Sequence, residues 1–295
     1  MKTNKTMQSH VLCLGYGYTA QVLAERCLQD GWRVTGTTRS DAKVTSIQAQ
    51  RLKVTIWDGQ SLLPDDALDG VTHLLQSIPP DDAGDRAMQH CSEQLANVSS
   101  LVWVGYLSTT GVYGNADGDW VDEQTSLAPT NKRGEQRVIA ENQWLDWGLK
   151  TSKSVQIFRL SGIYGKDRNA LRKVKDGTAR RLKIENQYFS RIHVADIANA
   201  IFASIQHPDA GAIYNICDDL PASAADVTTY AADLLGIEPP PWQTLDEANL
   251  SQMAQSFYQN SKRVCNHKMK QALQVNLDFP NYKMGLKHLF ENGDY

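Results

Sequence analysis

The chain has 295 residues, of which 41% are hydrophobic and 21% are charged, and its formal net charge is -3. This is the composition of an ordinary globular protein, long enough for one large α/β unit or for a core domain with a smaller lobe. The slightly acidic balance argues against a nucleic-acid partner, because polyphosphate backbones attract basic surfaces.

The N-terminal residues, the apolar segments and the cysteines indicate the cellular compartment of the protein. Residues 1–9 are polar, do not resemble a signal peptide, and are expected to be disordered or loosely held. No apolar stretch approaches membrane-spanning length. Five cysteines are scattered without a Cys-x-x-Cys motif, and none of the seven histidines has metal-ligand spacing. We therefore expect a soluble, cytoplasmic protein with no membrane partner and no metal site.

The first predicted unit is a strand, a turn and a helix. An apolar strand breaks at Gly15 and Gly17, and a helical apolar pattern opens at Ala20. In Gly15-x-Gly17-x-x-Ala20 the first glycine permits a tight turn, the second leaves room for a pyrophosphate, and the small third residue allows close packing. The start of the helix then faces the anion. This pattern predicts a dinucleotide site at Gly15, Gly17 and Tyr18, with an ordinary glycine turn as the alternative.

The second predicted strand, 33–37, ends at Thr38 and Arg39. In dinucleotide folds an acidic residue at this strand end usually bonds the ribose 2′-hydroxyl. An arginine can instead bind a 2′-phosphate, since unit charges 4 Å apart attract by roughly 4 kcal/mol at an effective dielectric of 20. We therefore expect Thr38 and Arg39 to contact the cofactor, with NADP preferred and NAD possible. The alternative is that Arg39 is a solvated residue before a helix.

Two further strand ends are expected near the same cofactor. The predicted strand 53–57 is followed by Asp58, which either accepts a hydrogen bond from the adenine amino group or begins a turn. The predicted strand 72–77 places Ser77 and Pro79 against the cofactor, because ligands lie at the carboxyl ends of parallel strands.

The rest of the chain alternates between strands and helices. Predicted strands 101–107, 155–160 and 212–217 are separated by helical patterns, and this predicts an α/β fold with a doubly wound parallel (Rossmann) sheet. Further helices are predicted around 223–235, 246–253 and 282–290. We expect a cofactor-binding core in residues 10–165 plus about 192–217, and a smaller C-terminal substrate lobe in about 166–191 plus 218–295.

A basic segment, 168–183, lies at the start of the predicted lobe. It is either a solvated helix face or a surface that attracts an anionic substrate.

Five landmarks occur in order along nearly the whole chain: Gly15-x-Gly17-x-x-Ala20, Leu107–Gly114, Phe158–Gly165, Arg191–Asp196 and Ile213–Asp219. Together they resemble the extended short-chain dehydrogenase/reductase superfamily, which includes nucleotide-sugar epimerases and dehydratases, and within it the atypical YeeZ-type branch. The resemblance implies a Rossmann core, a C-terminal substrate lobe, a catalytic Ser or Thr after the fifth strand, and a Tyr-x-x-x-Lys pair on the next helix.

The sequence departs from that pattern at the catalytic pair. Glu141 matches the helix glutamate that follows the family's lysine by four residues, and this puts Arg137 in the lysine position and Arg133 in the tyrosine position. The family's tyrosine moves a proton at a substrate oxygen, whereas an arginine stays protonated. The loss of acid–base catalysis would slow a reaction by about 10²- to 10⁴-fold.

The candidate catalytic residues are therefore Thr109, Arg133, Arg137 and Tyr113. Thr109 can hydrogen-bond a substrate oxygen, and Arg133, Arg137 or Arg191 can bind its charged substituents. Tyr113 and Tyr164 precede glycines at strand ends and are substitute acids or, as the favoured alternative, packing residues.

The Tyr-x-x-x-Lys spacing does occur once, in a distant part of the chain. Among 11 tyrosines only Tyr258 has a lysine, Lys262, four residues later. This pair lies far along the chain from the fifth strand, and we interpret it as a chance match.

Two functional hypotheses follow. The first is an NADP-dependent oxidoreductase or epimerase-like enzyme that acts on a small polar or anionic substrate. The second is a non-catalytic redox sensor that distinguishes NADPH from NADP. A homodimer is plausible by analogy with the superfamily.

Overall fold

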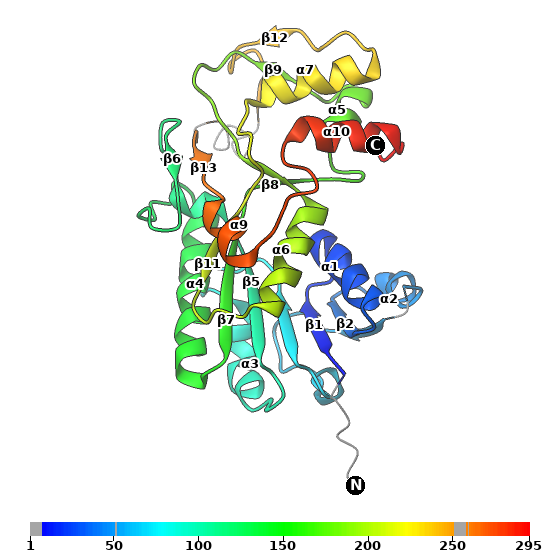
Figure 1. The fold of residues 1–295 in the computed structure, drawn as a ribbon, viewed down its shortest axis with the longest axis vertical. Coiled ribbons are helices and arrows are strands. Elements are labelled where there is room, and N and C mark those ends of the chain that lie inside the picture. The colour runs from blue at the N-terminus through cyan, green and yellow to red at the C-terminus, as the bar shows by residue number, and fades with distance from the viewer. Residues whose placement is uncertain (1–7, 51, 251–257, 259) are drawn as a thin grey trace. The chain divides into compact units, whose positions relative to one another are not determined.

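The structure, a computed structural model, describes residues 8–50, 52–250, 258 and 260–295 (Figure 1). Seven strands form its main sheet. They are β1 (His10–Leu14), β2 (Arg33–Thr38), β3 (Lys53–Ile56), β4 (His73–Gln76), β5 (Trp103–Thr109), β7 (Ser154–Leu160) and β11 (Ile213–Ile216).

The sheet has the strand order β11-β7-β5-β4-β1-β2-β3. Neighbouring strands run parallel in the series β5, β4, β1, β2 and β3. In this register Leu12 of β1 lies opposite Thr35 of β2 and opposite Leu74 of β4. The chain reverses direction across the sheet after β3, so that β4 returns to the other side of β1. The prediction of a doubly wound parallel sheet is confirmed.

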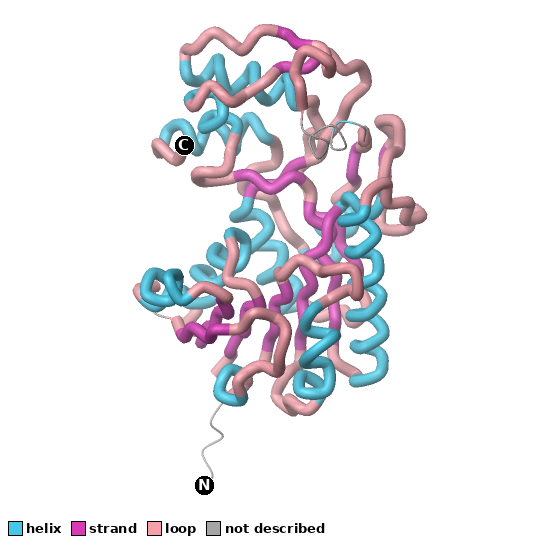
Figure 2. The backbone as a smooth tube through the Cα atoms, turned by 180° about the vertical axis from the view of Figure 1, so that it is seen from behind, coloured by secondary structure: helices cyan, strands magenta, loops and turns pink. Residues whose placement is uncertain are grey.

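Helices connect the strands and cover the sheet. They are α1 (Tyr18–Gln29), α2 (Asp41–Gln48), α3 (Arg86–Ala96), α4 (Lys132–Thr151) and α6 (Val194–Gln206), with a short 3-10 helix η1 (Asp65–Ala67) before β4. Figure 2 shows α3 and α4 on the face turned toward the viewer, whereas α1 lies on the other face.

Further helices and small strands lie outside the main sheet and its covering helices. They are η2 (Thr110–Tyr113), β6 (Trp120–Val121), β8 (Gly162–Tyr164), α5 (Ala170–Lys175), β9 (Arg181–Leu182), β10 (Arg191–His193), α7 (Ala224–Leu235), β12 (Trp242–Gln243), β13 (Arg263–Val264), α9 (His267–Leu273) and α10 (Tyr282–Glu291). The small strands pair as β8 with β10, β9 with β12, and β6 with β13.

The chain divides into two compact units. Unit 1 comprises the residues up to Ser108, then Gln136–Phe158 and Ile201–Ile213. Unit 2 comprises Thr109–Glu135, Arg159–Ala200 and Tyr214–Tyr295.

Each unit has its own apolar core. In unit 1, Trp144 of α4 stacks on Tyr106 of β5 with ring centroids 6.4 Å apart and meets the edge of Trp147 at 5.5 Å. In unit 2, α5, α7 and α10 pack around buried residues such as Leu171 and Leu286. Burial of these side chains stabilises each unit, at roughly 1.5–3 kcal/mol for a large apolar side chain.

One local prediction in unit 2 was wrong. The segment predicted as a helix over 246–253 forms a turn in its described part, up to Leu250. Residues 251–253 lie outside the described residues. The strands β6, β8 and β13 were not predicted, because elements of two or three residues are too short to show a periodicity.

Candidate functional site

The turn between β1 and α1 in unit 1 has the shape that a pyrophosphate needs. Gly15 has φ +82°, and a Cβ there would lie 2.8 Å from Ile78 Cγ1, so only glycine fits. Gly17 has φ -99°, and a Cβ there would meet no described atom within 4 Å. Because Gly17 is also the N-cap of α1, the cap residue has no side chain that could bond the first amides of the helix. Open space therefore adjoins an uncapped helix start, which favours an anion.

Side chains from neighbouring strands fix this turn. Ser77 Oγ donates to the Leu14 carbonyl at 3.0 Å and to the Gly15 carbonyl at 2.5 Å. Thr37 Oγ1 accepts a hydrogen bond from the Gly15 amide at 2.8 Å. Ser77 thus shapes the turn from behind, while Pro79 is exposed and Tyr18 occupies the first position of α1.

The end of β2 places the Arg39 side chain at the surface. Thr38 Oγ1 accepts from the Ser40 amide at 3.2 Å. Ser40 is the N-cap of α2, but its side chain makes no capping hydrogen bond. Arg39 is exposed, and no described residue forms an ion pair or a hydrogen bond with its guanidinium. A guanidinium beside a free hydroxyl suits a phosphate group.

The sequence left two roles open for Asp58, a hydrogen bond to the adenine amino group or the start of a turn. Its carboxylate accepts a hydrogen bond from the Gln60 amide at 2.9 Å, so it begins a turn, and it is exposed. The turn therefore explains the hydrogen bond of one Asp58 carboxylate oxygen, and no ligand is needed for it.

The loop after β5 in unit 2 is tightly packed. Thr109 Oγ1 accepts a hydrogen bond from the Gly111 amide at 3.1 Å, which leaves the hydroxyl proton available for donation. Gly114 has φ +70°, and a Cβ there would lie 1.9 Å from the Ala128 carbonyl oxygen. This loop is fixed by backbone contacts and offers the Thr109 hydroxyl as a donor.

Tyr113 lies within that packing. Its side chain is 2% exposed, and its hydroxyl donates to Asn215 Oδ1 at 2.8 Å and accepts from Arg159 Nη1 at 2.9 Å. Burial raises the pKa of Tyr113, and burial also raises the pKa of Tyr164. Both positions favour the packing interpretation over a role as a catalytic acid.

The two arginines of α4 have different surroundings. Arg133 lies in the first turn of α4 in unit 2 and is exposed, with no partner among the described residues. In unit 1, Arg137 Nη1 donates to the Leu107 carbonyl, and its guanidinium lies 5.8 Å from the centroid of the Tyr106 ring. The nearby Glu141 is buried and accepts a hydrogen bond from Ser108 Oγ. Arg137 therefore joins α4 to β5, whereas Arg133 is free to bind a ligand.

Lys262 lies against the loop after β5, a contact that the sequence interpretation did not predict. Its ammonium donates to the Gly114 carbonyl, although 148 residues separate the two. Burial lowers the pKa of Lys262 to about 8. Distance along the chain was one reason for interpreting the Tyr258 and Lys262 match as chance, yet the fold brings Lys262 to the loop after β5. Whether the match has a functional meaning stays a prediction.

The basic segment at the start of the lobe is used mainly for internal contacts. Arg181 donates to the Pro240 carbonyl at 2.5 Å and lies 4.8 Å from the Trp242 ring centroid, and Arg172 pairs with Asp176 at 2.9 Å.

Arg191 is similarly occupied. It donates to the carbonyls of Phe189 and Ala222 at 2.9 and 2.8 Å. These hydrogen bonds, like those of the basic segment, argue against the anion-binding interpretations of both.

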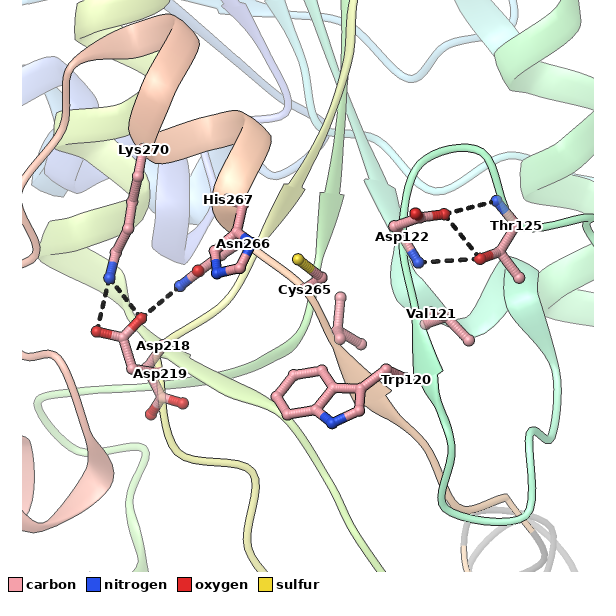
Figure 3. A pocket seen from close by; sticks show the side chains of 11 residues that line it. Trp120, Val121, Asp122, Thr125, Asp218, Asp219, Cys265, Asn266, His267 and Lys270 are labelled. Atoms are coloured by element: carbon pink, nitrogen blue, oxygen red, sulfur yellow. Dashed lines mark hydrogen bonds and ion pairs between the residues drawn. The ribbon is translucent and has the colours of Figure 1, made fainter.

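A separate pocket of about 580 Å³ lies within unit 2, between the β6–β13 pair and α9 (Figure 3). Trp120 contributes an indole that is 59% exposed. Asp219 is paired with Lys270 at 2.5 Å, and Asp122 accepts hydrogen bonds from the amide and hydroxyl of Thr125 at 2.9 Å. Asp218 is 1% exposed, and burial raises its pKa to about 8. The one lysine of this lining is already paired, so the pocket does not suit a diphosphate.

Within the described residues, no helix has both the length and the apolar composition needed to cross a membrane. No group of three or more His, Cys, Asp or Glu residues is placed to hold a metal ion in that part of the chain. All five cysteines are free thiols.

Comparison with known proteins connects this geometry to a family. Residues 11–217 match the model of the NAD dependent epimerase/dehydratase family. The chain is 30% identical over 270 residues to Protein YeeZ of Escherichia coli (strain K12), covering 87% of this chain and 93% of that protein.

Two solved structures are similar over nearly the whole chain. A functionally unknown conserved protein from Silicibacter pomeroyi DSS has 44% identity and a TM-score of 0.89, covering 98% of this chain and 100% of that one. The dTDP-glucose 4,6-dehydratase from Bacillus anthracis str. Ames in complex with NAD has 17% identity and a TM-score of 0.76, covering 96% of both chains. This second similarity shows a shared fold.

Proposed function

Because the chain belongs to the NAD dependent epimerase/dehydratase family, we propose that it is an oxidoreductase or epimerase-like enzyme that prefers NADP to NAD. The observation that carries the proposal is the turn between β1 and α1. Gly15 is confined to a conformation that only glycine adopts readily, and beside Gly17 there is open space at an uncapped helix start. A pyrophosphate fits such a turn because it needs close backbone approach and amide donors.

The preference for NADP rests on Arg39. Its guanidinium is exposed and has no partner among residues 8–50, 52–250, 258 and 260–295, and the next residue, Ser40, makes no capping hydrogen bond with its side chain. We assign Arg39, Thr38 and Ser40 to the 2′-phosphate, which an acidic residue at this strand end would repel. When bound, the nicotinamide would supply or accept a hydride. Asp58, Ser77 and Pro79 stay in the proposal as residues that line the cofactor or support its turn.

The substrate in this proposal is a small polar or anionic molecule, and a nucleotide sugar is one candidate by analogy with the dTDP-glucose dehydratase of the same fold. Thr109 would donate its hydroxyl proton to a substrate oxygen, because its oxygen already accepts from the Gly111 amide. Arg133 would bind an anionic substituent, since it is exposed and has no described partner. The predicted core and lobe, a cytoplasmic location and a homodimer belong to the same proposal.

Calorimetric titration tests the cofactor assignment directly. The purified protein is expected to bind NADP at least tenfold more tightly than NAD. A panel of carbonyl compounds and sugar nucleotides, followed by NADPH absorbance, then tests turnover. If neither nicotinamide nucleotide binds at millimolar concentration, the proposal is wrong.

A redox sensor is the second candidate, and the replacement of the Tyr and Lys pair favours it. Arg133 cannot exchange a proton, and Arg137 is occupied by the Leu107 carbonyl. A sensor must bind NADPH and NADP with different affinities, because a ligand shifts an equilibrium only by its differential affinity. Equal dissociation constants for the two forms would exclude it.

A further inference from the structure

The pocket between the β6–β13 pair and α9 has no role in the proposed function, because it lies within unit 2 and does not suit a diphosphate. Its volume of about 580 Å³ falls within the range of small-molecule sites, roughly 300–1,000 Å³. Three segments that are distant in sequence line it, 120–125, 218–219 and 264–270. The pocket is therefore large enough for a small ligand of its own.

Hydrogen bonds between these segments fix the shape of the pocket. The Cys265 amide donates to the Val121 carbonyl at 2.9 Å, next to the pairing of β13 with β6. Asn266 Nδ2 donates to the Cys217 carbonyl and to Asp219 Oδ1, both at 2.8 Å. The walls are thus held by the fold, and the polar lining keeps its positions without a ligand.

The lining carries more negative than positive charge. Its described residues include three aspartates, Asp122, Asp218 and Asp219, and one lysine, Lys270. Lys270 donates to both carboxylate oxygens of Asp219, at 2.5 and 2.6 Å, so these two charges compensate each other. Asp122 keeps its charge, because hydrogen bonds from Thr125 lower the pKa of its carboxyl group. The pocket therefore favours a cation over an anion.

The carboxyl group of Asp218 is only partly satisfied by the protein. Its Oδ1 accepts from the Leu220 amide at 3.2 Å, whereas Oδ2 is buried and has no hydrogen-bond partner in the part of the chain that the structure describes. The residue is 1% exposed. In Figure 3 the carboxyl group of Asp219 points toward Lys270, and that of Asp218 points away from it. A buried oxygen without a hydrogen bond is costly, and a donor on a ligand would remove that cost.

The indole of Trp120 gives the same pocket an aromatic wall. It is 59% exposed, although Trp120 belongs to the strand β6. Val121 and Val264, which lie opposite each other in β6 and β13, add apolar lining. An indole face attracts a cation through its quadrupole. The aromatic wall and the aspartates therefore favour a ligand of the same charge.

We propose that this pocket binds a small organic ammonium ion, whose N–H groups donate to Asp218 Oδ2 and whose apolar part lies against the Trp120 indole. The ligand class is an amine with an apolar body, and phosphates and carboxylates are rejected. The site is independent of the nicotinamide nucleotide, because all of its described lining belongs to unit 2.

Binding should release a proton from Asp218. Burial raises the pKa of this carboxyl group to about 8, so at pH 7 it is mostly protonated. A bound cation favours the ionised form, and about one proton should leave for each ammonium ion bound at pH 7. Fewer protons should leave near pH 9, where the free carboxyl group is already ionised.

Other groups around Asp218 influence this titration. Arg191 of β10 favours the ionised form, and the aspartates nearby oppose it. The charged or titratable groups that act on Asp218 or line the same pocket are Tyr164 of β8, Arg191 of β10, Asp196 of α6, Tyr282 of α10, Cys217 and Asp219 beside it in the chain, and His267 and Lys270 of α9.

Three probes that share an apolar body and differ in charge test the site: 2-phenylethylammonium, 2-phenylethanol and phenylacetate. In calorimetric titration of the full chain at pH 7, the ammonium should bind at least tenfold more tightly than the alcohol, and phenylacetate should bind most weakly. Titration in two buffers of different ionisation enthalpy measures the released proton. Equal affinities for the three probes, tighter binding of phenylacetate, or no ammonium binding at millimolar concentration overturns the proposal.

Two variants separate the contributions of charge and aromatic surface. Asp218→Asn should lower affinity for the ammonium at least tenfold, change affinity for the alcohol less than twofold, and abolish proton release. Trp120→Ala should lower affinity for both probes, and it should fold normally because the indole is exposed. If Asp218→Asn does not fold, Trp120→Ala and the three probes still decide. Unchanged ammonium affinity in Trp120→Ala, or in a folded Asp218→Asn, overturns the proposal.

Matched residues of unit 2 outside the pocket serve as controls. Asp233 of α7 is an exposed aspartate, and Trp242 of β12 has an indole that is 49% exposed. Asp233→Asn and Trp242→Ala should leave the affinity for 2-phenylethylammonium within twofold of the wild-type value, and equal losses in these controls would overturn the assignment. The ammonium should also bind unchanged in the presence of NADP, and competition between the two would contradict a separate site.

Discussion

Two glycine-bearing turns follow parallel strands in this protein, and they are built in opposite ways. At the β1 turn in unit 1, Gly17 faces open space, and α1 begins without a side-chain cap. At the β5 turn in unit 2, Gly114 is pressed against the Ala128 carbonyl, and the Tyr113 hydroxyl has two partners. The first turn has room for a ligand, and the second is filled by the protein.

This difference separates two uses of glycine. Gly17 is needed only if a pyrophosphate occupies the adjoining space, whereas Gly114 is needed for the chain to fold. The β5 turn is therefore a rigid part of the fold, which the Lys262 ammonium contacts at the Gly114 carbonyl. Loss of a residue from the first turn should affect binding, and loss from the second should affect stability.

The largest expected effect is on the folding of the β5 turn. Gly114→Ala places a Cβ against a backbone oxygen and in the left-handed region, which should cost about 2–5 kcal/mol in the free energy of unfolding. Chemical denaturation measures this loss. Gly177→Ala is the matched control, because Gly177 has φ +66° with no described atom within 4 Å of a Cβ. Equal losses in the two variants would contradict the comparison.

Gly17→Ala should show the reverse pattern. The variant should keep its melting temperature, because the added methyl group meets no described atom. Its Kd for NADP should rise by about 5- to 150-fold, which corresponds to an overpacking cost of about 1–3 kcal/mol in the complex. Gly162→Ala in β8 is the control, with its nearest contact at 3.4 Å. Unchanged affinity in Gly17→Ala would show that no pyrophosphate lies there.

Arg39→Asp should reverse the choice of cofactor. A carboxylate repels the 2′-phosphate, so affinity for NADP should fall at least tenfold while affinity for NAD is kept or improved. Titration of both nucleotides at two salt concentrations checks this result, because screening weakens the repulsion. A preference that does not change would mean that Arg39 does not contact the 2′-phosphate.

The smallest effect concerns the pH dependence of stability at Lys262. The pKa of this lysine is about 8 in the folded protein and about 10.4 in the unfolded chain, so between these values the unfolded chain binds more protons. Stability should therefore rise from pH 8 to pH 10.4, and the full penalty should act below pH 8. Lys262→Met should remove this slope and should be more stable than the wild type at pH 7, because the penalty for the buried ammonium exceeds the loss of one hydrogen bond to Gly114.

Thermal unfolding of the wild type and Lys262→Met across that pH range measures the difference. Identical slopes would mean that the amine titrates in the folded protein as it does in the unfolded chain.

The sequence predicted those features that depend on neighbouring residues. The β1 turn and the sheet follow from glycine spacing and alternating apolar segments, which are local patterns. Arg137 could be aligned with the family's lysine, but only the fold shows that its guanidinium is held by the Leu107 carbonyl. Lys262 could not be placed, because its partner is fixed by the pairing of β13 with β6, two strands of two residues each.

The separation of 148 residues between Gly114 and Lys262 also has a consequence for biosynthesis. A ribosome makes the chain from the N-terminus, so the glycine turn of β1 is complete long before the lysine leaves the exit tunnel. A product that stops short of Asn260 would contain Gly15, Gly17 and Arg39 but would lack β13, the strand that pairs with β6. Completion of unit 2 therefore waits for the last part of the chain to be made.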